Sequence, residues 1–158
     1  MRVAQALLEE HGADPLATTR RFDVALGFDK GGTPLHAAMF GCPQQHIDEM
    51  VALLLRNGAD PNRRGGSGAS PLLAAVGFHN APGLQALMKH AKGTLRLEDG
   101  LKLNHASPLN CAAYASTPKM VEALLDAGAN VLHVNDVRRR SAAPLLPART
   151  RLSAVCLS

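Results

Sequence analysis

The feature that most constrains the fold is a four-residue motif that recurs at a fixed interval. TPLH at 33–36 returns as SPLL at 70–73 and as SPLN at 107–110, so each copy begins 37 residues after the one before. A fainter copy, APLL at 143–146, follows 36 residues after the third. A period of roughly 20 to 50 residues is typical of arrays in which each unit is stabilised by its neighbours.

Each copy of this motif carries the signals of a helix start. Thr33, Ser70 and Ser107 have hydroxyls that can cap a helix, and the proline after each fits the first helical position, where no N–H is needed. A second motif alternates with the first: GAD at 12–14 and 58–60, and GAN at 128–130. Its glycine fits the end of a helix, where a left-handed residue is favoured.

The segments that precede the second motif predict a further set of helices. The stretches IDEMVALLLRNG and KMVEALLDAG place apolar side chains three and four residues apart, which puts them on one helical face. These side chains are Met50, Val51, Leu54 and Leu55 in the first stretch and Met120, Val121, Leu124 and Leu125 in the second.

The two motifs in this order resemble the ankyrin repeat, across about Val3 to Asn130. The resemblance implies an all-α, ankyrin-type α-solenoid of stacked helix–turn–helix repeats joined by β-hairpin loops. The period exceeds the family's roughly 33 residues. We place the extra residues at CPQQ (42–45) in one repeat and within 92–106 in the next.

We expect an ankyrin repeat domain over 1–142, with a half repeat at 1–15 and full repeats that start near 31, 68 and 105. The segment 143–158 is expected to be a degenerate or truncated repeat with a basic tail. The half repeat begins inside an outer helix and has no inner helix of its own, so its apolar residues Val3, Leu7 and Leu8 are expected to be partly exposed. This predicts self-association through the unfinished ends.

Cysteine content and hydropathy limit where in the cell the protein is expected and which kinds of site it can contain. Cys42, Cys111 and Cys156 form no close pair, which disfavours a disulfide framework or a zinc ribbon. No apolar run approaches the roughly 18 residues of a membrane span, and no signal peptide is recognised. These observations predict a cytoplasmic protein that needs no membrane, and the basic tail leaves a nuclear location open.

The arginines at 138–140, followed by Ser141, form the strongest charge cluster. RRRS resembles a site for a basophilic kinase, so Ser141 is a candidate for modification. The cluster also fits a nuclear address, or the solvated edge of the last hairpin. Nucleic-acid binding is disfavoured, because no aromatic stacking residue accompanies the arginines.

Signatures of catalysis and of cofactor binding are missing from the sequence. RRGGSGASP (63–71) is glycine-rich but lacks the Gly-Lys-Ser/Thr of a phosphate-binding loop. The histidines and cysteines do not have the spacing of a metal site. We therefore predict a non-enzymatic chain without cofactor or metal. The resemblance implies that His36 is structural and bonds to the adjacent loop. Leu73 cannot make that bond, which predicts a weaker junction there.

The predicted function is protein binding by a scaffold or adaptor, because family members use hairpin tips and inner helices as a concave groove. Carried over to this chain, the groove is lined by Asp29, Lys30, Phe40, Ser67, Phe78, Asn104 and Tyr114. The three aromatic residues lie at the end of the predicted inner helices, either as partner anchors or as plugs beneath the inter-helix loops. The alternative function is a substrate-recruiting fragment of a larger enzyme, such as a ubiquitin ligase or a kinase.

Asn62 is a second candidate for modification. Leu54 lies eight residues before it and Asp60 two before it, an arrangement that resembles the ankyrin-loop asparagine modified by asparaginyl hydroxylases. The competing interpretation is an unmodified turn asparagine.

Overall fold

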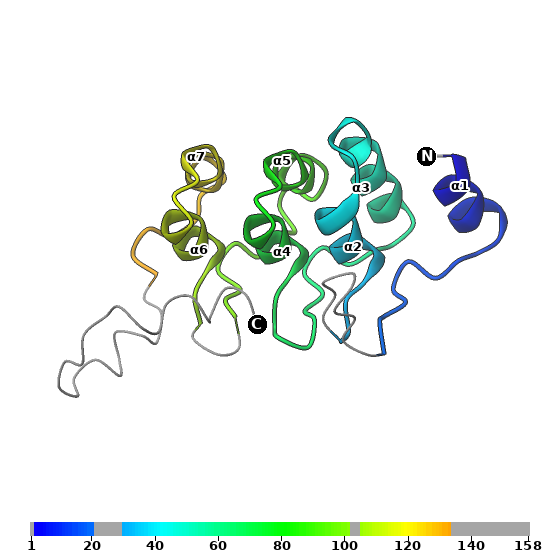
Figure 1. Cartoon of the computed structure of the whole chain (residues 1–158), viewed down its shortest axis with the longest axis horizontal. Helices are drawn as coiled ribbons and strands as arrows, with labels where there is room; N and C mark the ends of the chain where they lie inside the picture. Colours follow the sequence, from blue (N-terminus) through cyan, green and yellow to red (C-terminus); the bar gives the residue numbers. More distant parts are fainter. Residues whose placement is uncertain (1, 21–29, 102–104, 134–158) are drawn as a thin grey trace.

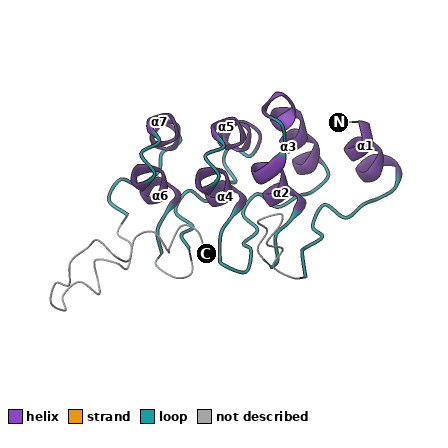
Figure 2. Cartoon of the chain, in the orientation of Figure 1, coloured by secondary structure: helices purple, strands orange, loops and turns teal. Residues whose placement is uncertain are grey.

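The computed structural model describes residues 2–20, 30–101 and 105–133. A short helix, α1, is continued by a π-helical segment, η1, and three helix pairs follow (Figure 1). The described residues contain helices and loops but no strand (Figure 2). The bounds are Arg2–Gln5 for α1, Ala6–Glu10 for η1, Pro34–Gly41 for α2, Gln44–His46 for the 3₁₀ helix η2, Ile47–Arg56 for α3, Pro71–Gly77 for α4, Ala81–His90 for α5, Pro108–Tyr114 for α6 and Pro118–Asp126 for α7.

The helix pairs stack side by side in two rows. In Figure 1 the inner helices α2, α4 and α6 form one row, the outer helices α3, α5 and α7 form the other, and long loops extend to one side. We call the pairs units 1, 2 and 3 and count them from residues 31, 68 and 105, so each unit includes the first part of the loop that follows it. The predicted all-α solenoid is confirmed.

The inner helices begin where the sequence predicts and for the predicted reason. The Ser70 hydroxyl accepts a hydrogen bond from Leu73 N at 3.3 Å, and the Ser107 hydroxyl accepts one from Asn110 N at 3.3 Å. A proline occupies the first turn of all three inner helices. These short helices are marginal alone and depend on packing against their neighbours.

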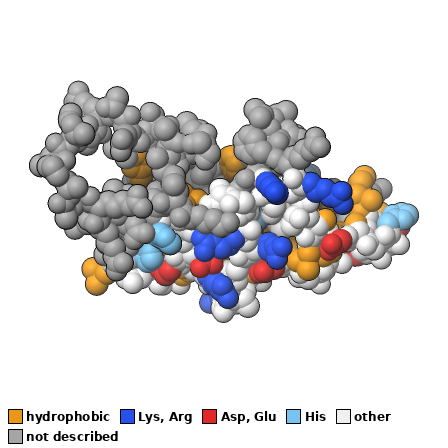
Figure 3. Space-filling model, turned by 90° about the horizontal axis from the view of Figure 1, so that it is seen from below, with side chains coloured by type: hydrophobic (Ala, Val, Ile, Leu, Met, Phe, Trp, Pro, Cys, Tyr) orange, Lys and Arg blue, Asp and Glu red, His pale blue; other side chains and the backbone are white. Residues whose placement is uncertain are grey.

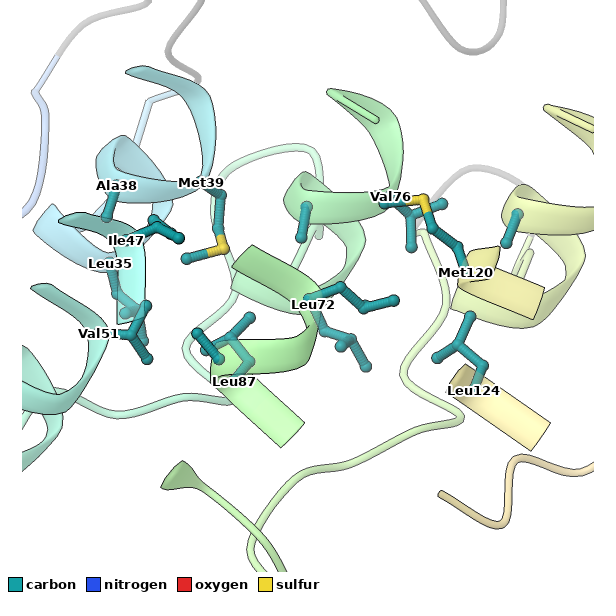
Figure 4. Packing of buried hydrophobic residues seen from close by; sticks show 14 of the residues in the cluster. Leu35, Ala38, Met39, Ile47, Val51, Leu72, Val76, Leu87, Met120 and Leu124 are labelled. Atoms are coloured by element: carbon teal, nitrogen blue, oxygen red, sulfur yellow. The ribbon is translucent and has the colours of Figure 1, made fainter. Parts of the chain in front are cut away.

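The core runs along the array between the two rows (Figure 4). Leu35, Leu72 and Leu124 are fully buried, and each contributes about 2 kcal/mol by removing apolar surface from water. Small residues on the inner helices, such as Ala75 and Ala112, are also fully buried, which lets adjacent helices approach closely.

The outer helices follow the predicted apolar faces with one exception. Val51 and Leu54 on α3 and Met120 on α7 are buried, but Leu125 on α7 remains 41% exposed. Leu125 stays exposed because α7 packs against α5 and α6, and no further described helix covers its other side. On α3, Leu53 is buried although the pattern did not include it.

The ends of the outer helices and the N-terminal half repeat also match the sequence. Gly58 and Gly128 both have a φ of +91°, the left-handed conformation that glycine adopts without strain. In the half repeat, Val3 is 74% exposed and Leu7 is 48% exposed, whereas Leu8 is partly buried against the core. Self-association through this face stays a prediction.

Several sequence predictions concern residues outside the described ranges. They are the groove residues Asp29 and Asn104, the candidate phosphorylation site Ser141, the third cysteine Cys156 and the segment 143–158.

Candidate interaction surface

Three aromatic side chains mark the ends of the inner helices, and we call them the aromatic row. Phe40 and Phe78 are each 42% exposed, and Tyr114 is 54% exposed. The rings of Phe40 and Phe78 meet edge to face, with their centroids 4.8 Å apart and an interplanar angle of 70°. This geometry is favourable for aromatic pairs and holds the two rings in a fixed arrangement.

The exposure of the row separates it from the core. On the same inner helix as Phe40, Leu35 and Met39 are fully buried. Phe40 is thus more exposed than these two neighbours, and both interpretations of the rings, as partner anchors or as plugs beneath the loops, stay predictions. Because the inner helices contain no Asp, Glu, Lys or Arg, the row stands on an uncharged surface.

Two of the loop residues predicted for the groove lie on neighbouring loop tips. Lys30 and Ser67 are both exposed. The carbonyl oxygen of Lys30 accepts a hydrogen bond from Gly66 N at 2.6 Å, so the loop before α2 contacts the loop before α4 directly. The Ser67 hydroxyl accepts from Ala69 N at 3.3 Å, which orders this tip.

Asn62 links two successive loops through its side-chain amide. Its Nδ2 donates to the carbonyl oxygen of Thr94 at 2.6 Å, and its Oδ1 accepts from Arg96 N at 2.8 Å. The backbone N–H of Asn62 donates to Asp60 Oδ1 at 2.9 Å, which forms the turn. Both polar atoms of the amide therefore bond to backbone groups of the following loop.

His36 is a structural residue, as predicted. Its Nδ1 accepts a hydrogen bond from Thr33 N at 3.1 Å, so the ring proton of the neutral form is on Nε2. Nε2 then donates to the carbonyl oxygen of Ala69 at 3.1 Å, across the junction to unit 2. Both ring nitrogens are satisfied, and none is left for catalysis or metal binding.

Asn80 has a similar role that sequence reasoning missed. Its Oδ1 caps α5 by accepting from Gly83 N at 2.8 Å, and its Nδ2 donates to the carbonyl oxygen of Met39 at 2.8 Å. An Asn followed by Ala-Pro at a helix start is a capping signal that could have indicated the first bond. The second bond reaches the preceding unit and has no local signal.

On the outer side, Asp48 connects α3 to α5. Its carboxylate lies 2.9 Å from Lys89 Nζ and 3.1 Å from His90 Nε2. The hydrogen bond from Lys89 holds the pKa of Asp48 below its usual value. Asp48 and His90 line an open cleft of about 600 Å³, together with Gln5 of the N-terminal helix and further residues of α3. Of the polar groups that line it, Asp48 and His90 bond to each other, and Gln5 bonds to Glu9 on the next turn of its own segment.

Two of the three cysteines lie in the described ranges. Cys42 and Cys111 form no disulfide and are partly buried, and burial raises the pKa of the Cys42 thiol, which keeps it protonated and weakly nucleophilic. Within the described ranges no His, Cys, Asp and Glu side chains gather in a group that could hold a metal ion. None of the helices described is both long and apolar enough to cross a bilayer.

Comparison with known proteins agrees with this architecture. The family model for ankyrin repeats (3 copies) matches residues 39–135. A Danio rerio protein named "Putative palmitoyltransferase ZDHHC13" is 34% identical over 142 residues, an alignment that covers 70% of this chain and 21% of that protein. The chain thus spans about a fifth of the length of this relative.

Among solved structures, the ankyrin repeat domain of Bcl-3, a member of the IkappaB family, is similar with a TM-score of 0.66 and 24% identity. That similarity covers 84% of this chain and 53% of the other. Ankyrin repeats generally mediate protein–protein interactions, and the fold is typically a non-catalytic interaction module. With the recurring motifs, the stacked helix pairs and the family match over most of its length, this chain belongs to the ankyrin repeat family.

Proposed function

We propose that this protein is a non-catalytic scaffold or adaptor that binds a partner protein through the aromatic row and the adjacent loop tips. The observation that carries the proposal is the position of Phe40, Phe78 and Tyr114. All three occupy the last turn or the cap of an inner helix, and all three are exposed although the core beneath them is well packed.

Energetics support binding at this row. Aromatic anchors often dominate interfaces, and truncation of one commonly costs roughly 2 kcal/mol or more of binding energy. The Phe40–Phe78 contact holds both rings before a partner arrives, which reduces the conformational entropy lost on binding. The partner would bury apolar surface that otherwise faces water.

The test is an affinity pull-down with mass spectrometry that compares the wild-type chain with the Phe40→Ala/Tyr114→Ala variant. Leu125→Ala is the matched control, because Leu125 is an exposed apolar residue on the outer side. We expect the aromatic variant to lose the partner and to keep its melting temperature, and the control to keep both.

Two results would contradict the proposal. Retention of every partner by the aromatic variant would exclude the row as the binding surface. A large loss of stability in the same variant, about 3 kcal/mol or more as for a buried ring, would assign the rings to the core.

A second candidate function is favoured by the relative from Danio rerio, whose printed name is that of an enzyme. In this alternative the chain is the substrate-recruiting part of a larger enzyme, whether a palmitoyltransferase, a ubiquitin ligase or a kinase. Mapping the full-length transcript decides between the two, because an enzyme requires a catalytic segment beyond the repeats. A transcript that ends at the present termini would exclude this alternative.

The two modification sites are proposals as well. Hydroxylation of Asn62 would add one oxygen atom to a peptide that contains this residue, and phosphorylation of Ser141 would add one phosphate. Peptide mass spectrometry of the protein from cells tests both, with Asn62→Ala and Ser141→Ala as controls.

A fluorescent fusion in which the arginines at 138–140 are replaced tests the proposed cytoplasmic location and the open question of nuclear entry.

A further inference from the structure

Two short stretches of the chain share a pattern in which a basic residue stands three positions before a hydroxyl, with two glycines between them. They are KGGT at 30–33 and RGGS at 64–67. A cation three residues before a serine or threonine is a feature that basophilic kinases recognise with their own carboxylates. The folded structure gives the two hydroxyls different surroundings.

The first hydroxyl is inaccessible to a kinase. Thr33 is 5% exposed at the start of α2, and its Oγ1 lies 2.9 Å from His36 Nδ1. Ser70 and Ser107, which cap the other two inner helices, are buried as well. A phosphate on any of these caps would require the start of an inner helix to unfold, because a charged group is costly to bury without a partner.

The second hydroxyl lies at the tip of the loop before α4. Ser67 is exposed there. Gly68 N donates to the carbonyl oxygen of Gly65 at 3.0 Å, which closes a four-residue turn with Ser67 at its third position. The other three residues of this turn are glycines, so no other side chain of the turn shields the hydroxyl. Glycine also allows the turn to open into the extended form that a kinase cleft binds.

The arginine of the second stretch lies at the same tip. Arg64 Nε donates to the carbonyl oxygen of Gly68, the residue after Ser67, at 2.9 Å, and Arg64 Nη2 donates to the carbonyl oxygen of Gly100. Both acceptors are neutral, and the arginine is exposed. Carboxylates of a kinase can therefore compete for this guanidinium, since their hydrogen bonds to it are charge-assisted and stronger.

The same guanidinium is placed to pair with the phosphate after transfer. Phosphoserine carries a charge of about −1.5 to −2 at neutral pH, and arginine binds it through charge-assisted hydrogen bonds. Along the chain, no Asp or Glu stands within six residues of Ser67 on either side. Figure 3, which views the molecule from the loop side, shows Lys and Arg side chains spread across this face with acidic ones among them.

We propose that Ser67 is a phosphorylation site for a basophilic kinase that recognises Arg64. In the reaction, Ser67 Oγ attacks the γ-phosphorus of ATP and forms an O–P bond. The bond between this phosphorus and the β,γ-bridging oxygen breaks, ADP leaves, and the hydroxyl proton passes to a base of the kinase. The inference does not depend on the proposed function, because it concerns the loop tip alone.

The experiment incubates the whole chain with ATP, Mg²⁺ and a purified kinase that selects arginine three residues before the serine. We expect one phosphate on the tryptic peptide 65–89, and fragmentation should place it on Ser67 and not on the buried Ser70. Arg64→Ala should slow the initial rate at Ser67 about tenfold or more, because it removes the charge that the kinase recognises. Arg63→Ala removes the neighbouring arginine as the matched control and should slow it less.

A second serine and a synthetic peptide make the outcomes distinct. Ser116 is exposed but has no Lys or Arg in the five residues before it, so it should stay unmodified. The peptide 62–72 serves as the reference substrate. Phosphorylation of this peptide but not of the folded chain would overturn the inference, because the loop would then hide Ser67. Failure of the peptide itself would overturn it too.

The protein isolated from cells treated with phosphatase inhibitors provides the last measurement. We expect part of the peptide 65–89 to carry the phosphate at Ser67, and Ser67→Ala should remove it. Complete absence of the phosphopeptide from this sample, with the unmodified peptide detected, would contradict the proposal.

Discussion

Between units 1 and 2, side chains make hydrogen bonds at the loops, the inner helices and the outer helices. Between units 2 and 3, the structure locates a side-chain hydrogen bond at the loops. At the first junction Asn62 bonds to the loop of unit 2, and His36 to Ala69. On the outer side, Asp48 pairs with Lys89. Polar contacts thus reinforce the apolar stack at every level.

At the second junction, the described side-chain bonds centre on Glu98. Its Oε1 accepts from Asn130 N at 2.6 Å, whereas its Oε2 lies 3.3 Å from His133 Nδ1 without accepting a hydrogen bond. Leu73 stands where unit 1 has His36, and Thr117 stands where unit 2 has Asn80. The Thr117 hydroxyl donates to Ala112 within its own unit, so it does not tie unit 3 to unit 2.

The outer helices show the same difference. Helices α3 and α5 are in more extensive contact than α5 and α7, whereas the inner helices pack about equally at both junctions. In a repeat array, stability is close to a sum of unit terms and nearest-neighbour terms. Unit 3 is therefore expected to open before units 1 and 2, and four predictions test this difference.

The largest effect is expected from core truncation in units 1 and 3. Leu54→Ala and Leu124→Ala each remove a buried leucine and should each cost about 2–5 kcal/mol locally. We expect Leu54→Ala to lower hydrogen-exchange protection across units 1 and 2 together, and Leu124→Ala to lower it in unit 3 alone. Loss of protection throughout the array in Leu124→Ala would show that the junctions are equally strong.

The second effect concerns His36. His36→Ala leaves Thr33 N without its acceptor and removes the donor to the Ala69 carbonyl, in a site that is almost fully buried. We expect a loss of about 2 kcal/mol in urea unfolding. Asn110→Ala, at the equivalent position of unit 3, is the control and should cost less. Equal losses would remove His36 as a cause of the difference.

The third effect concerns the link between the loops. Asn62→Ala removes two hydrogen bonds between units 1 and 2 and should cost about 1–2 kcal/mol in thermal unfolding. Asn57→Ala is the matched control, because Asn57 bonds only to Leu53 O of its own helix. If both variants have the same melting temperature, the Asn62 amide does not strengthen the junction.

The smallest effect is expected from the exposed ion pair and depends on pH. Because Lys89 lowers the pKa of Asp48 in the folded chain, the pair stabilises the fold above the unfolded value of about 3.9. This contribution is lost as pH falls through the lower folded value. Asp48→Asn should therefore melt slightly below the wild type from pH 5 to 8, with the gap closing near about pH 3.

Glu49→Gln is the control for this pair, since Glu49 is an exposed neighbour on α3 without an ion pair in the described ranges. A pH-independent gap in Asp48→Asn would mean that the substitution acts through something other than the charge.

The sequence by itself determined the type of repeat unit, the number of units and the residues where their helices begin and end. Capping hydroxyls before proline and left-handed glycines act through bonds a few residues apart, so their effect can be predicted locally. The sequence also located the aromatic row, because each ring stands seven or eight residues after its helix-capping Thr or Ser.

Only the tertiary structure decided how firmly the units are joined and which side chains remain exposed. The Asn62 amide meets backbone groups 32 and 34 residues away, and the Asn80 amide reaches one 41 residues away. Such bonds depend on how one unit sits on the next, which no local pattern encodes. The exposure of Phe40 and of Leu125 has the same origin, since burial depends on whether a neighbouring helix covers that face.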